Sequence, residues 1–134
     1  MTRSSGSVFK LKIRERRAVL AVIVSAVLAA TVWTLPIPIT GRKEPWDADS
    51  LYYFAGLAVA GAVSGVVVPK HLWAHYLGAV LGQAANELPF LKLGPQFILG
   101  LVFLAGYSII FVVAAAIVVL LRKRRTSEST DDSA

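Results

Sequence analysis

The side chains of this sequence that could carry chemistry inside an apolar environment lie in one segment, residues 71–88. Most are separated by three, four or eight residues, which places them on one face of a helix that turns by about 100° per residue. We call this set the polar stripe, and its members are His71, His75, Gln83, Asn86 and Glu87. Titratable and amide groups aligned within a membrane can form a proton or cation path, here with Glu87 at the outer mouth.

A structural interpretation of the same residues competes with the path, and we favour it. His71, His75 and Glu87 fall near the two ends of the segment, where polar side chains cost little free energy at a membrane surface. Glu87 is then an interfacial carboxylate. This interpretation leaves only Gln83 and Asn86 as groups that need hydrogen-bond partners within the membrane.

Gln83 constrains the packing most, because an unpaired amide in hydrocarbon costs several kcal/mol. We therefore expect its side chain to face protein. Candidate partners are Ser64, Ser108 and Tyr107, or the backbone of a neighbouring helix. Depth in the membrane favours Ser64, but the sequence does not select among them.

Metal binding and catalysis find little support. His71 and His75 are four residues apart, as two ligands on one helix face would be, but the sequence has no other histidine and no cysteine. The apolar segments also lack a pair of carboxylates, a glycine-rich phosphate loop and a nucleophile spaced from a base. We expect no cofactor, no metal and no enzymatic activity.

The elements that position these residues are apolar segments. Of 134 residues, 56% are hydrophobic and 16% are charged, against about 25% charged in soluble domains. This composition predicts an all-α integral membrane protein. The apolar segments are residues 18–35, 51–68, 71–88 and 97–121, the shorter ones of about 18 residues, near the minimum that crosses a 30 Å hydrocarbon core. Tyr52 and Tyr53 suit a membrane interface at the start of the second segment.

Basic residues predict the orientation. The net charge is +6, and basic clusters flank the first and last apolar segments. The orienting residues are Arg14, Arg16, Arg17, Arg122, Lys123, Arg124 and Arg125. Because Lys and Arg accumulate on the cytoplasmic side, both termini are expected there, which requires an even number of spans and makes residues 71–88 a crossing helix. The clusters suit anionic lipid headgroups and not nucleic acid.

The predicted organisation has three parts. Residues 1–17 form a basic cytoplasmic segment, residues 18–121 a four-helix membrane domain, and residues 122–134 a basic and then acidic disordered tail. The expected location is the bacterial cytoplasmic membrane. The first apolar segment also resembles a secretory signal peptide, but it continues through Trp33 and Leu35, which favours an uncleaved anchor.

Small residues indicate where helices approach closely. The second apolar segment has Gly61 and Gly65 at the GxxxG spacing, and the third has Gly78 and Gly82. The turn between these segments is very short, so we expect a tight antiparallel hairpin whose glycine faces pack on each other or on another subunit. The predicted function is an accessory or structural subunit that binds a membrane partner through Gly/Ala faces. The alternative is a homo-oligomeric channel or transporter with a polar path along the third helix.

Overall fold

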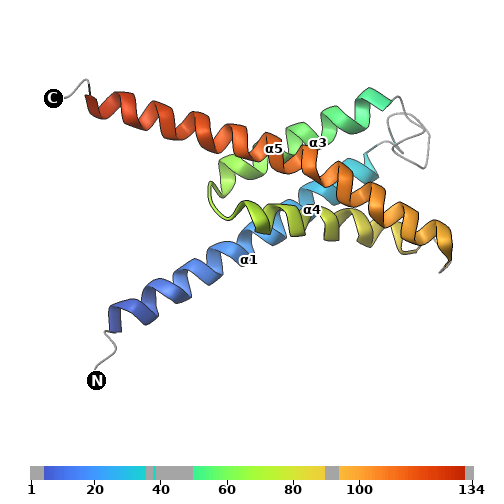
Figure 1. Ribbon diagram of the computed structural model, residues 1–134, viewed down its shortest axis with the longest axis horizontal. Coiled ribbons are helices and arrows are strands. Elements are labelled where there is room, and N and C mark those ends of the chain that lie inside the picture. Colours follow the sequence, from blue (N-terminus) through green and yellow to red (C-terminus); the bar gives the residue numbers. More distant parts are fainter. Residues whose placement is uncertain (1–4, 36–37, 39–49, 90–93, 132–134) are drawn as a thin grey trace.

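The computed structural model describes residues 5–35, 38, 50–89 and 94–131, and within these ranges the chain forms four helices and no strand. The helices are α1 (Ser5–Thr34), α3 (Ser50–Val67), α4 (Leu72–Glu87) and α5 (Pro95–Asp131) (Figure 1). The prediction of an all-α protein is confirmed, and each predicted apolar segment falls on one helix, although α1 and α5 extend well beyond the predicted bounds.

Two of the helices are long and apolar enough to cross a membrane. They cover Gly6–Thr34 and Pro95–Thr130, and α3 contributes a shorter apolar helix, Leu51–Val67. With 30 residues in α1 and 37 in α5, a rise of 1.5 Å per residue gives lengths of about 45 and 55 Å, beyond the roughly 30 Å of a hydrocarbon core. The structure differs from the expected disordered tail, since α5 continues as a helix through residues 122–131.

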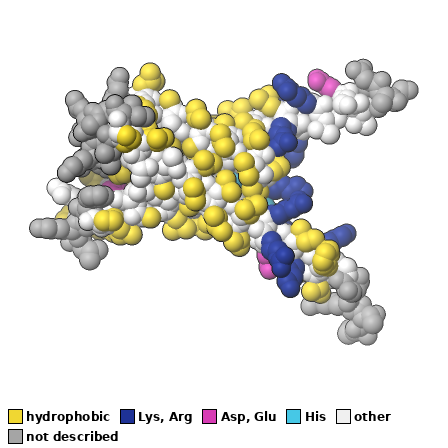
Figure 2. Space-filling view, turned by 180° about the vertical axis from the view of Figure 1, so that it is seen from behind, with side chains coloured by type: hydrophobic (Ala, Val, Ile, Leu, Met, Phe, Trp, Pro, Cys, Tyr) yellow, Lys and Arg dark blue, Asp and Glu magenta, His cyan; other side chains and the backbone are white. Residues whose placement is uncertain are grey.

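Within the described ranges, the basic residues collect at one end of the molecule. The start of α1 and the end of α5 both lie there, at the left of Figure 1, and the opposite end carries the end of α4 and the start of α5. Figure 2 shows the Lys and Arg side chains as a band at the border of an apolar body. Arg122 donates a hydrogen bond of 2.8 Å from Nη1 to the carbonyl oxygen of Val66, near the carboxyl end of α3.

The four helices pack as a ring in which neighbours in sequence are not always neighbours in space. The largest contacts join α1 to α4 and α3 to α5, and smaller ones join α4 to α5 and α1 to α3. Helices α3 and α4 therefore lie across the ring from each other, except near their connecting turn. Buried side chains from the four helices meet at its centre, among them Ala29, Leu57, Ala79, Leu104 and Phe111.

The expected packing of the two glycine faces on each other is wrong. A methyl group on Gly61 would collide with the carbonyl oxygen of Phe111, and one on Gly65 would lie 2.7 Å from that of Ala115, so both residues pack on α5. Methyl groups on Gly78 and Gly82 would instead collide with backbone atoms of α1. Glycine spacing shows where a backbone can approach, but it does not specify which helix approaches.

The turn between α3 and α4 explains how the two helices diverge. Its last residue, His71, has φ 63° and ψ 59°, in the left-handed region that residues other than glycine rarely adopt. Helix α4 begins at the next residue, Leu72. His71 therefore lies outside the helix and does not continue its regular 100° rotation, so the chain leaves α3 in a new direction after only a few residues.

Candidate functional site

Three residues of the polar stripe turn into the bundle. His75 and Gln83 are fully buried, and Glu87 is only 5% exposed. His71 is half-buried in the turn, and Asn86 is half-buried and donates a hydrogen bond of 2.9 Å to the carbonyl oxygen of Gly82 in its own helix. The structure thus retains His75, Gln83 and Glu87 as the inward-facing part of the stripe, and the interpretation of His75 and Glu87 as surface groups does not fit their burial.

His75 belongs to a cluster that joins three helices, which we call the histidine cluster. Its Nδ1 lies 2.7 Å from Oγ of Ser25 on α1 and 2.8 Å from Oγ of Ser64 on α3, and the two hydroxyls are 2.8 Å apart. Its Nε2 lies 2.8 Å from the carbonyl oxygen of Val68. A carbonyl only accepts, so Nε2 carries the proton, and in the neutral ring Nδ1 accepts a hydrogen bond from a serine hydroxyl.

Gln83 belongs to a second cluster, the glutamine cluster, which joins α3, α4 and α5. The Tyr53 hydroxyl donates to Oε1 of Gln83, and Nε2 of Gln83 donates to Oγ of Ser108 at 2.8 Å. Nε2 also donates to the carbonyl oxygen of Ala79 at 3.1 Å, while Ser108 donates to that of Leu104 at 2.8 Å. Every polar atom of the Gln83 side chain is therefore bonded, as its depth in the bundle requires.

Small residues separate the two clusters. His75 and Gln83 are eight residues apart, which corresponds to about 12 Å along a helix. Between them, Gly78 and Gly82 pack against the backbone of α1, and Ala79 is fully buried. Each cluster therefore forms its own hydrogen-bonded unit, and α4 brings them onto one inward face without joining them.

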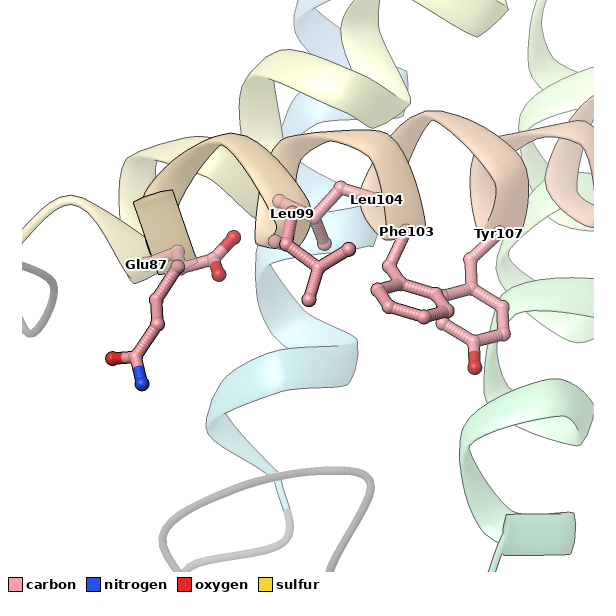
Figure 3. Close-up of a pocket in the computed structure, with 7 residues that line it drawn as sticks. Glu87, Leu99, Phe103, Leu104 and Tyr107 are labelled. Atoms are coloured by element: carbon pink, nitrogen blue, oxygen red, sulfur yellow. The ribbon is translucent and has the colours of Figure 1, made fainter. Parts of the chain in front are cut away.

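Glu87 lines a pocket between the end of α4 and the first turns of α5. The cavity measures about 350 Å³, and its other lining residues all come from one face of α5: Gln96, Leu99, Gly100, Phe103, Leu104 and Tyr107. Figure 3 shows the Glu87 carboxylate pointing toward α5, with the Leu99 and Phe103 side chains following along the pocket. The site combines one acidic group with apolar and aromatic walls.

Sequence reasoning identified the inward residues of α4 but missed part of their surroundings. Among the expected partners of Gln83, Ser108 is correct, whereas Ser64 bonds to His75 instead. Ser25 was not singled out, although it is the only polar residue within residues 18–30. Tyr53 was assigned to the membrane interface because aromatic belts are common there, and the structure buries it at 2% exposure.

The basic residues predicted to set the orientation are exposed, whereas the predicted histidine pair is not formed. Arg14, Arg16 and Arg17 on α1 and the basic residues 122–125 on α5 are all exposed. His71 and His75 do not share a helix face, and the described residues contain no group of three His, Cys, Asp or Glu side chains that could hold a metal ion. No family model, curated protein or solved structure matches the chain.

Proposed function

We propose that the protein is a small, non-enzymatic integral membrane protein that spans the bacterial cytoplasmic membrane four times and serves as an accessory or structural subunit. Both termini are cytoplasmic in this proposal. The apolar lengths of α1 and α5 support it, as does the band of Lys and Arg at the end where both these helices project beyond the apolar body. Such a band suits the anionic headgroups of one membrane face.

The observation that carries the proposal is the use of buried polar side chains as cross-links between helices. The histidine cluster ties α1, α3 and α4 together, and the glutamine cluster ties α3, α4 and α5 together. Hydrogen bonds between membrane helices contribute about 0.6 kcal/mol each on average. Together they favour one arrangement of the four helices, which suits a rigid subunit that presents a fixed outer surface.

The partner surface we propose is the outer face of α5. The glycines expected to bind a partner are occupied inside the bundle, but a methyl group on Gly106 would meet no atom within 4 Å. Exposed apolar side chains surround this glycine at helical spacing, namely Val102, Ile109 and Val113. A shallow apolar surface with a glycine at its centre lets a second helix approach closely.

The alternative of a homo-oligomeric channel or transporter receives less support. A path along α4 would have to pass from His75 to Gln83, and fully buried Ala79 lies between them, with Gly78 and Gly82 closely packed on α1. The polar atoms of His75 and Gln83 are also occupied by other side chains or backbone. A conducting path would require both clusters to open.

Photocrosslinking in native membranes tests the accessory role. With p-benzoylphenylalanine in place of Ile109 on the α5 face, irradiation should give a discrete adduct with one membrane protein, identifiable by mass spectrometry. The same group at Val59, an exposed position on the outside of α3, serves as the matched control and should give lipid adducts. Lipid adducts alone at both positions would contradict the proposed partner surface.

A further inference from the structure

The pocket at the end of α4 has the dimensions and the asymmetry of a small-molecule site. Its volume of about 350 Å³ lies within the range of ligand sites in proteins. One end carries the Glu87 carboxylate, and the walls carry Leu99, Phe103 and Tyr107. A ligand that fills such a cavity needs one polar group at the acidic end and an apolar body elsewhere.

The acidic end is built into the fold. Glu87 is 95% buried by its neighbours and is the last residue of α4, and its carboxylate lies against Gly100 of α5. A methyl group at position 100 would collide with Oε1 of Glu87 and lie 3.2 Å from its Cδ. The glycine therefore provides the space in which the carboxylate reaches α5 and borders the cavity.

The aromatic walls of the pocket favour a cationic ligand, as the Glu87 carboxylate does. The rings of Phe103 and Tyr107 are stacked at an interplanar angle of 22° with centroids 6.3 Å apart, and Phe54 of α3 packs against Tyr107 at 5.5 Å. The faces of such rings attract ammonium groups, more strongly where water is excluded. A carboxylate next to aromatic walls therefore selects an organic cation over an anion or a neutral polar ligand.

The cavity opens to the side of the bundle. Leu99 and Phe103 line it and are 57% and 55% exposed. In the proposed membrane orientation these side chains border lipid near the outer surface, because α4 begins beside the basic band and ends at Glu87. A ligand with an apolar body can thus enter from the membrane.

We propose that this pocket binds an organic cation with an apolar body, placing its ammonium group on the Glu87 carboxylate and its body along Leu99, Phe103 and Tyr107. The ligand is either the amino headgroup of a phospholipid or a free hydrophobic amine, which share this chemistry. The route from the membrane rests on the proposed four-span placement, whereas the recognition of the cation rests only on the pocket.

The test measures binding of radiolabelled benzyltrimethylammonium by equilibrium dialysis, with the full chain in nanodiscs of digalactosyldiacylglycerol and phosphatidylglycerol, lipids that carry no ammonium group. Wild type should bind saturably, and Glu87→Gln, which keeps the shape and removes the charge, should weaken binding by about tenfold or more. Glu87→Asp keeps the charge on a shorter side chain and should bind between the two. Glu128→Gln, on the exposed tail of α5, is the control and should bind as wild type does.

Gly100→Ala is an independent probe, since it displaces the carboxylate without removing it, and it should also weaken binding. Competition by added phosphatidylethanolamine would identify a lipid headgroup as the natural occupant, and lack of competition would identify a free amine. No saturable binding by wild type, or equal binding by wild type and Glu87→Gln, would overturn the proposal. Repeating the comparison in detergent micelles separates the site from the membrane placement, because a wrong topology would leave the dependence on Glu87 intact there.

Discussion

Replacement of Gln83 by leucine tests whether the glutamine cluster holds the bundle together. The change removes two side-chain hydrogen bonds between helices, to Tyr53 and to Ser108, at about 0.6 kcal/mol each. It also leaves the hydroxyl of Tyr53, a residue only 2% exposed, without its acceptor, which costs about 1–3 kcal/mol. Ser108 keeps its bond to Leu104. The expected loss in free energy of unfolding is therefore about 2–4 kcal/mol.

The assay is reversible unfolding of the micelle-embedded protein by sodium dodecyl sulfate, followed by circular dichroism. Asn86→Leu is the matched control, because the Asn86 side chain bonds to its own helix, and it should change stability by about 0.5 kcal/mol or less. Tyr53→Phe combined with Gln83→Leu removes the stranded hydroxyl and should recover about 1 kcal/mol relative to Gln83→Leu alone. The reasoning is refuted if Gln83→Leu costs no more than Asn86→Leu, or if the double variant recovers nothing.

Three further predictions concern the histidine cluster, the glycine contacts and the topology. His75→Leu should cost about 2–3 kcal/mol in the same assay, since it removes the bonds to Ser25, Ser64 and Val68; a neutral effect would mean that the cluster does not hold α4 in place. Gly61→Ala should cost about 1–3 kcal/mol because its methyl group meets α5 backbone, whereas Gly106→Ala should be neutral or stabilising; similar effects at both positions would contradict the packing. The chain lacks cysteine, so single cysteine variants can report the topology. In spheroplasts, an impermeant maleimide should label Gln96→Cys directly and Lys70→Cys only after permeabilisation. Labelling of both variants from one side would exclude a crossing by residues 71–88.

The sequence predicted the helices well and their neighbours poorly, for physical reasons. A helix forms its backbone hydrogen bonds within one segment and needs no neighbour for them, so each apolar run forms a helix whichever helices it packs against. The packing of α1 on α4 and of α3 on α5 depends on which backbones meet. A glycine such as Gly61 or Gly82 allows close approach, but its position in the sequence does not determine which helix approaches it. The left-handed conformation of His71 is also not predictable from the sequence, because residues other than glycine adopt it rarely, even histidine, in which it is enriched.

The same limit applies to the site. The burial of Gln83 followed from the cost of an unpaired amide, and that argument needs no knowledge of the partner. That Tyr53 is the residue whose hydroxyl donates to Gln83 depends on the tilt of α3. The spacing of residues in the sequence does not encode this tilt. Glu87 was placed at an interface from its position at a helix end, and its burial follows from the space that Gly100 leaves on α5.

The ring order of the helices has a consequence for synthesis on the ribosome. Helix α3 emerges before α5, yet α5 is the helix that covers Gly61 and Gly65. The nascent chain therefore exposes a glycine face, and the Gln83 amide lacks its Ser108 partner, until α5 arrives. A chain truncated before α5 would keep these surfaces uncovered, and exposed surfaces of this kind are what chaperones and proteases recognise. Completion of α5 is therefore the step that ends this exposure.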